Sequence, residues 1–406
     1  MDPVSNPERL GFDRGRLGRI RDWMQRYVDQ GRFPGAATLI ARQGEIAYLA
    51  WTGQRDIEKR LPWQQDTLAR IFSMTKPVTS VALMMLYEQG LVHLEDPVDS
   101  FLPELKSRHV LIRGARSLEE TAPAQTRMTL RHLLTHTSGF TYGMNGGVLG
   151  EIYARERLGV NFAGGGLAAL VTRLGQLPLD VEPGTRWHYG VSTDVLGRVV
   201  EVVSGKTLEA FFQESILGPL GMNDTAFSVP DGKTDRFASL YMRTPQALMQ
   251  LIEDGQGSAQ RAGKVDTFLG GAGLVSTITD YWRFAEMLRG GGVFRGARLL
   301  APRTVRLMAS NHLPGDIASM GPATWSETSF EGVGFGLCGL VILDPAKAQA
   351  SASVGDFGWG GMASTVFWVS PADDLVVVFL TQLMPSDAHP NRKELRALVH
   401  QALVDR

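Results

Sequence analysis

The sequence predicts an α+β protein in which strands at both ends of the chain flank a largely helical middle. Two β-like runs near the start, 36–42 and 45–51, are joined by Gln43-Gly44, a strong hairpin signal. From residue 73 to about residue 221 the apolar residues recur mostly at helical spacing. The last third returns to apolar strand-like runs, at 334–343, 363–369 and 375–381. We therefore expect an antiparallel sheet with a mostly helical insertion.

Helices are expected at both ends of the chain, where they would flank this sheet. Asp13 can cap a helix that runs to about Gln30, and a closing helix spans 391–403. A helix followed by a hairpin differs from the βαβ alternation of nucleotide-binding sheets, and no Gly-x-Gly-x-x-Gly follows a strand. The sequence thus predicts no cofactor. We expect residues 1–72 and 240–406 to form a discontinuous α/β domain, and 73–239 a mostly helical one.

Composition narrows the classes of partner. The 41 basic and 42 acidic residues nearly cancel, so no charged surface for nucleic acid or an anionic membrane is indicated. No apolar run is long enough to cross a bilayer, and the N-terminus lacks the apolar core of a signal peptide. The single cysteine, Cys338, cannot form an internal disulfide and lies in an apolar run typical of a buried, inert thiol. We expect a cytoplasmic protein that acts on a small molecule; the oligomeric state is not indicated.

The most informative stretch is Ser73-Met74-Thr75-Lys76. Apolar residues at three- and four-residue intervals follow it, so Ser73 should lie at the start of a buried helix with Lys76 one turn along the same face. A partly desolvated lysine at this spacing can take the serine proton. The alternative reading is a helix N-cap, because Ser-x-x-Lys is common and serine is a frequent cap.

Further motifs follow in the chain. Residues 129–139 read Thr-Leu-Arg-His-Leu-Leu-Thr-His-Thr-Ser-Gly, and 183–189 read Pro-Gly-Thr-Arg-Trp-His-Tyr, with Asp194-Val195-Leu196-Gly197 shortly after. Near the C-terminus stands Gly358-Trp359-Gly360-Gly361, preceded far upstream by the glycine-rich run 270–274. Together with the Ser-x-x-Lys stretch, these motifs resemble the serine β-lactamase-like family over nearly the whole chain. That family includes class C β-lactamases, D-Ala-D-Ala carboxypeptidases and, most similar here, the family VIII carboxylesterases.

The resemblance implies a β-lactamase/transpeptidase-like fold with the active site in the cleft between the two domains. It implies that Ser73 becomes acylated while Lys76 and Tyr189 share the proton transfers. A tyrosine ordinarily titrates near pH ~10, so a neighbouring cation is needed for it to act as a base at neutrality. The backbone N–H groups of Ser73 and Met362 would form the oxyanion hole, and Trp359, Gly360 and Gly361 would line the substrate site.

Two departures from the lactamase pattern favour neutral esters of short to medium acyl chain over lactams. Gly190-Val191 follows the tyrosine where lactamases have Ala-Asn, which removes an amide that binds acylamino side chains. Trp359 stands where those enzymes carry the lysine that binds the substrate carboxylate. An indole offers apolar area and no charge. A carboxylesterase is therefore the preferred interpretation.

Several alternatives stay open from the sequence. An acyltransferase would pass the acyl group from Ser73 to an alcohol, and a β-lactamase or D-amino-acid peptidase could use the same site. A non-catalytic binding protein on this scaffold is disfavoured because Ser73, Lys76 and Tyr189 are all present. No metal site is expected: His132 and His136 have zinc-like spacing, but Leu133 stands where the general-base glutamate belongs, and both histidines are better explained by local packing near a helix C-terminus. His188 could line the site or play a structural role. No Gly-x-Ser-x-Gly supplies a competing nucleophile.

Overall fold

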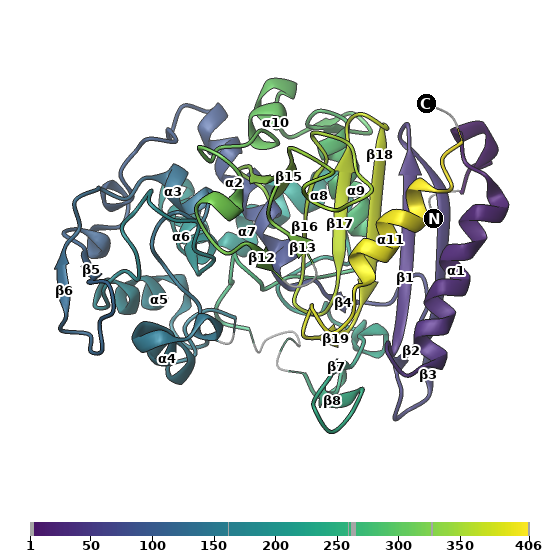
Figure 1. The fold of residues 1–406 in the computed structure, drawn as a ribbon, viewed down its shortest axis with the longest axis horizontal. Helices are drawn as coiled ribbons and strands as arrows, with labels where there is room; N and C mark the ends of the chain where they lie inside the picture. The colour runs from purple at the N-terminus through teal and green to yellow at the C-terminus, as the bar shows by residue number, and fades with distance from the viewer. Residues whose placement is uncertain (1–3, 161, 259, 261–264, 326–327, 405–406) are drawn as a thin grey trace.

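A computed structural model describes residues 4–160, 162–258, 260, 265–325 and 328–404. Its centre is an antiparallel eight-stranded sheet to which both ends of the chain contribute (Figure 1). The strand order is β14-β15-β16-β17-β18-β1-β2-β3. These strands are β1 (Gly35–Arg42), β2 (Glu45–Asp56), β3 (Leu61–Pro62), β14 (Val333–Phe335), β15 (Leu340–Ile342), β16 (Phe357–Gly360), β17 (Val366–Ser370) and β18 (Leu375–Thr381). The predicted fold class is confirmed.

The centre of the sheet joins the N-terminal hairpin to the C-terminal strands. β1 pairs with β2 on one side and with β18 on the other, with Thr38 opposite Phe379 in the second pair. Gln43 and Gly44 both have positive φ, 55° and 84°, as a tight hairpin turn requires. The hairpin predicted from Gln43-Gly44 is therefore confirmed.

Helices cover both faces of the sheet, so β1 and β18 are buried along their whole length. α1 (Arg14–Asp29) and α11 (Asn391–His400) pack on the face that carries Ile40 and Phe379. α9 (Ile278–Arg289) packs on the opposite face, where Tyr281 lies 5.1 Å from Phe367 between ring centres. Asp13 caps α1 by accepting a hydrogen bond from Arg16 N at 2.7 Å, as its place in the sequence predicts.

The middle of the chain is mostly helical and lies beside the sheet, away from α1 (Figure 1). α2, which follows Ser73, packs against α6 in this region. The helices are α2 (Thr75–Glu88), α3 (Leu130–Leu134), α4 (Gly147–Arg155), α5 (Gly166–Gly175), α6 (Ser192–Ser204), α7 (Leu208–Phe212) and α8 (Gly218–Leu220), with α10 (Pro302–Met308) later in the chain. The domain limits expected from the sequence stay a prediction.

Short strands pair outside the main sheet. They are β4 (Ala69–Arg70), β5 (His109–Leu111), β6 (Thr121–Pro123), β7 (Leu240–Met242), β8 (Gln250–Glu253), β9 (Val275–Ser276), β10 (Val293–Phe294), β11 (Ala297–Arg298), β12 (Thr324–Trp325), β13 (Thr328–Ser329) and β19 (Leu383–Met384). Among the described residues, no helix is both long enough and apolar enough to cross a membrane.

One predicted strand is wrong. The apolar run 334–343 is a hairpin, β14 and β15, and the turn between them is closed by a 2.8 Å hydrogen bond from Gly336 N to Gly339 O. Two glycines three residues apart allow the chain to reverse inside an otherwise apolar run. Cys338 lies in this turn, where burial raises the pKa of its thiol to about 12, in agreement with an inert thiol.

Candidate active site

Ser73 lies where a short 3₁₀ turn, η2 (Phe72–Met74), leads into α2. Phe72 has a φ of +43°, a left-handed conformation that typically costs a bulky residue about 1–3 kcal/mol. Two hydrogen bonds to other segments stabilise this turn. Tyr281 Oη donates to Met74 O at 2.8 Å, and Ile71 N donates to Leu274 O at 3.2 Å. The expected position of Ser73 at the start of a buried helix is confirmed.

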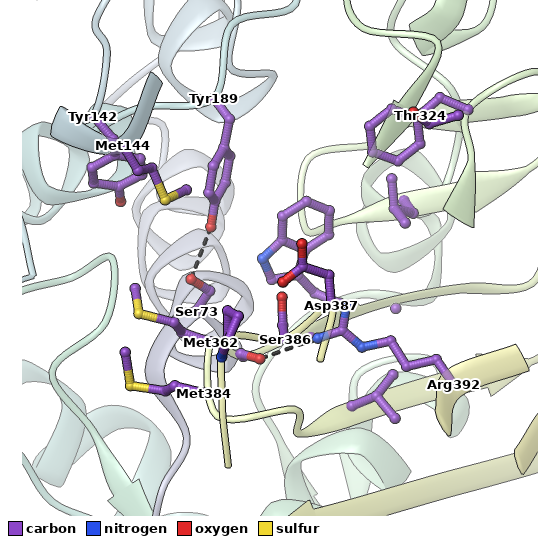
Figure 2. A pocket seen from close by; sticks show the side chains of 18 of the residues that line it. Ser73, Tyr142, Met144, Tyr189, Thr324, Met362, Met384, Ser386, Asp387 and Arg392 are labelled. Atoms are coloured by element: carbon purple, nitrogen blue, oxygen red, sulfur yellow. Dashed lines mark hydrogen bonds between the residues drawn. The ribbon is translucent and has the colours of Figure 1, made fainter. Parts of the chain in front are cut away.

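A cavity of about 880 Å³ opens over Ser73. Six of the residues singled out from the sequence line it: Ser73, Tyr189, Trp359, Gly360, Gly361 and Met362. Lys76 lies beneath this surface and is only 5% exposed. Tyr142 and Met144 stand on the same side of the cavity as Tyr189, whereas Ser386, Asp387 and Arg392 face them from the other side (Figure 2).

Ser73 and Lys76 lie together as their spacing predicts, and Tyr189 joins them as the family resemblance implies. Tyr189 Oη lies 2.8 Å from Ser73 Oγ, the hydrogen bond drawn in Figure 2. Lys76 Nζ lies 3.4 Å from the same oxygen and 4.8 Å from the centre of the Tyr189 ring. The serine oxygen is thus within reach of a phenol oxygen and an amine, the two groups that could accept its proton.

Lys76 makes two further contacts that the sequence does not reveal. Its Nζ donates to Gly271 O at 2.7 Å and lies 3.1 Å from Tyr142 Oη. Tyr142 is buried, and burial raises the pKa of its phenol well above the ordinary value, so its hydroxyl stays protonated. The one available signal for Tyr142 was its place three residues after the 129–139 motif.

Aromatic rings fix the orientation of Tyr189. Trp187 stacks nearly parallel to it, at 12° with ring centres 6.0 Å apart, and Trp359 lies 5.5 Å away at a tilt. The His136 ring lies 4.7 Å from that of Tyr189. Burial holds the pKa of His136 well below its usual value, so this imidazole is neutral. His136 therefore has the packing role that was predicted, and the ring that it packs against is that of Tyr189.

The end of β16 passes close to the turn that carries Ser73. A Cβ on Gly361 would overlap the carbonyl oxygen of Ile71, so only glycine allows this approach. Arg392 Nη2 supports the strand end by donating to Gly361 O at 3.1 Å. Among the described residues, no acceptor pairs with the N–H of Met362, the next residue along. A backbone N–H is thus available beside Ser73.

The other histidines singled out from the sequence serve the fold. His132 Nδ1 accepts a 3.2 Å hydrogen bond from Thr129 N, so it caps the N-terminus of α3 and not the expected C-terminus. His188 Nε2 lies 3.0 Å from Thr141 Oγ1 and 3.0 Å from Asp180 Oδ2, which assigns it a structural role. Within the described part of the chain, no three His, Cys, Asp or Glu side chains gather as metal ligands would.

A family model described as Beta-lactamase matches residues 20–401, almost the entire chain. The chain belongs to the beta-lactamase family. Its sequence motifs thus lie on the fold that this family uses, with Ser73 within hydrogen-bond distance of Lys76 and Tyr189.

The chain is similar to a mycobacterial protein, to an esterase and to a hydrolase of known structure. Protein Rv1367c of Mycobacterium tuberculosis is 37% identical over 88% of this chain and 88% of its own. Esterase EstB of Burkholderia gladioli is 33% identical over 93% of each chain. The solved structure of EstCE1, described as a hydrolase with promiscuous acyltransferase activity, superposes with a TM-score of 0.79 at 29% identity, covering 96% of this chain and 99% of its own. This protein is a serine hydrolase or acyl-transfer enzyme of the beta-lactamase family.

Proposed function

We propose that this protein is a carboxylesterase that cleaves neutral esters of short to medium acyl chain through an acyl-enzyme on Ser73. The observation that carries the proposal is the contact between Tyr189 Oη and Ser73 Oγ, 2.8 Å, with Lys76 Nζ 3.4 Å from the same oxygen. The 33% identity with Esterase EstB across nearly the full chain supports ester chemistry at this site.

Acylation begins with proton transfer from Ser73 Oγ to Tyr189 Oη, whose anionic form is stabilised by the ammonium group of Lys76 below its ring. Ser73 Oγ attacks the ester carbonyl, and the electron pair of the C=O bond moves onto oxygen. When the tetrahedral intermediate collapses, the bond to the alcohol breaks and Tyr189 returns its proton to the leaving alcohol. Water then attacks the acyl carbonyl while Tyr189 takes its proton. The bond between Ser73 Oγ and the acyl carbon breaks, Tyr189 returns the proton to Ser73 Oγ, and the carboxylic acid leaves.

The backbone N–H groups of Ser73 and Met362 are the proposed oxyanion donors. The Met362 N–H is unpaired among the described residues, and Gly361 permits β16 to lie against the Ser73 turn. Losing one such donor typically costs about 3 kcal/mol of transition-state stabilisation. Gly360 and Gly361 would thus serve substrate binding by letting the acyl carbonyl reach this position.

The cavity wall favours a neutral acyl group. Trp359 presents an indole where a carboxylate-binding lysine would stand in a lactamase, and further apolar side chains continue this surface: Leu158, Val160, Phe330, Val333 and Leu340. Burial of apolar ester surface contributes about 25 cal/mol per Å². The indole itself offers a carboxylate no charge in exchange for the hydration that it would lose there.

A panel of p-nitrophenyl esters of graded acyl length, run beside nitrocefin, tests the proposal. We expect p-nitrophenyl butyrate to exceed nitrocefin by at least about 100-fold in kcat/KM, which corresponds to about 2.8 kcal/mol. Equal turnover of the two substrates would refute the assignment and favour a lactamase or peptidase.

Acyl transfer to an alcohol is the second candidate. It is supported by the promiscuous acyltransferase activity stated for EstCE1, and by a cavity of about 880 Å³, roomy enough for an acceptor beside the acyl group. Hydrolysis and transfer differ only in whether water or an alcohol attacks the acyl-enzyme. Product analysis with and without added alcohol separates them: a new ester formed at the expense of free acid would identify transfer.

A further inference from the structure

Two sequence motifs without an assigned role meet beneath the Ser73 site. Asp194 lies in the first turn of α6, and Gly270-Gly271 belongs to the glycine-rich run that precedes β9. The backbone of Gly271 connects Asp194 to Lys76: Gly271 N donates to Asp194 Oδ1 at 2.8 Å, and Gly271 O accepts from Lys76 Nζ at 2.7 Å. In the sequence, Gly271 is 77 residues from Asp194 and 195 residues from Lys76.

Gly271 and the side chain of Asp194 are in close contact. A Cβ on Gly271 would lie 2.8 Å from Asp194 Oδ2, so the carboxylate packs directly on the glycine. The carbonyl of the same Gly270–Gly271 peptide is also held, because Gly270 O accepts a 2.7 Å hydrogen bond from Thr79 Oγ1 on α2. This peptide therefore connects α2 to α6, and the carbonyl of the next peptide, Gly271 O, accepts from Lys76.

Asp194 is 1% exposed, and a carboxylate this deeply buried needs a cation or several hydrogen bonds. The titratable groups around the junction are Lys76, Tyr142, Tyr189 and His136. His136 and Tyr142 are neutral, for the reasons given above. Burial raises the pKa of Asp194, whereas the charge of Lys76 and the Gly271 N–H oppose that rise. Lys76 is thus the cation that balances Asp194.

The contacts of Lys76 match its charged form. An ammonium group has three donors, and Lys76 Nζ has three oxygen neighbours: Gly271 O, Tyr142 Oη and Ser73 Oγ. Gly271 O can only accept, and Tyr142 keeps its proton. We propose that Asp194 is a positioning residue whose carboxylate holds Lys76 as an ammonium group and, through the backbone of Gly271, aims it at Ser73 and Tyr189. This inference rests on the proposed function, because it assigns the proton transfers to Tyr189 and the stabilising charge to Lys76.

The test compares Asp194→Asn, Asp194→Glu and Asp280→Asn with the wild type. Asn keeps the shape and the acceptor for Gly271 N but removes the charge; Glu keeps the charge. Asp280, a buried carboxylate on α9 that accepts hydrogen bonds from Asp224 N and Thr225 Oγ1, is the matched control. The readout is kcat/KM for p-nitrophenyl butyrate from pH 5 to pH 9, with circular dichroism to check folding.

Loss of an anion disfavours the protonated form of a neighbouring amine, so Lys76 should lose its proton at lower pH, and the alkaline limb of the Asp194→Asn profile should move to lower pH by about one unit. We also expect kcat to fall at least about tenfold with KM changed less than about threefold. Asp194→Glu should keep the limb at the wild-type position, and Asp280→Asn should not move it. An unmoved limb in a folded Asp194→Asn enzyme would overturn the inference.

Two further readouts separate this inference from the proposed function. If the wild type does not turn over esters, the proposed function fails, and the pH dependence of Ser73 labelling by a fluorophosphonate takes the place of kcat/KM in the Asp194 test. If Asp194→Asn does not fold, NMR of ¹³C-lysine-labelled wild type decides: we expect the Lys76 signal, identified by its loss in Lys76→Ala, to stay at the ammonium position at pH 7. A neutral amine at pH 7 would overturn the inference.

Discussion

Replacing Tyr189 with phenylalanine removes one hydroxyl from Ser73 and leaves the ring in its packing. The ring is held by Trp187, His136 and Trp359, so the variant should fold. Loss of one buried hydrogen bond, 2.8 Å in length, should cost about 1 kcal/mol of unfolding free energy. Loss of the proton carrier should lower kcat about 10²–10⁴-fold, or about 3–5 kcal/mol in the activation barrier. The substitution should thus change the activation free energy of the reaction more than it changes the free energy of unfolding.

Steady-state kinetics with p-nitrophenyl butyrate, together with a urea titration, measures both quantities. KM should change little, because the hydroxyl acts in proton transfer and contributes little to ground-state binding. Tyr241→Phe is the matched control: Tyr241 Oη accepts from Ile57 N at 2.8 Å and donates to Glu58 Oε2 at 2.6 Å, away from the cavity. It loses two hydrogen bonds, so it should lose at least as much stability as Tyr189→Phe and keep its turnover. A kcat of Tyr189→Phe within about fivefold of the wild type would refute the reasoning and leave Lys76 as the base.

Three further outcomes are expected. Tyr142→Phe removes one of the three oxygens around Lys76 and should lower kcat about tenfold. A larger loss of kcat than in Tyr189→Phe would contradict the assignment of the proton transfer to Tyr189. Trp359→Lys should narrow the preference for p-nitrophenyl butyrate over nitrocefin, because a charged contact to a carboxylate is worth about 1.5–3 kcal/mol, and an unchanged kcat/KM ratio would count against the role of the indole. Burial raises the pKa of Asp280 to about 6, above its unfolded value near 3.9, so its contribution to stability is fully present below about pH 4 and is lost as the pH rises through 6. Relative to the wild type, Asp280→Asn should therefore gain up to about 3 kcal/mol of unfolding free energy between pH 4 and pH 7.5 in urea titrations; parallel curves for the two proteins would exclude this linkage.

Features set by neighbouring residues could be predicted from the sequence. Asp13 caps α1 because its side chain reaches an N–H three residues later, and Gln43-Gly44 turns the first hairpin through its own backbone angles. Ser73 and Lys76 meet because they lie one turn apart at the start of α2. In each case the spacing along the chain already fixes the distance in space.

Features set by tertiary packing could not be predicted from local patterns. Tyr189 could be paired with Ser73 only through the resemblance to a known family, because 116 residues separate them. Tyr142, Asp194 and Gly271 converge on Lys76 from three segments whose local sequences give no sign of that meeting. The break between β14 and β15 was missed for another reason: the apolar character of the run hid the Gly336–Gly339 turn.

The central claim is that Ser73 forms a covalent acyl-enzyme, and intact-protein mass spectrometry tests it most directly. The wild type treated with a serine-directed fluorophosphonate should gain the mass of one adduct, and brief mixing with p-nitrophenyl butyrate before an acid quench should show one butyryl group. Peptide mapping should place both on Ser73, and Ser73→Ala should show neither. An adduct that persists in Ser73→Ala at the wild-type level would place the nucleophile elsewhere and contradict the account.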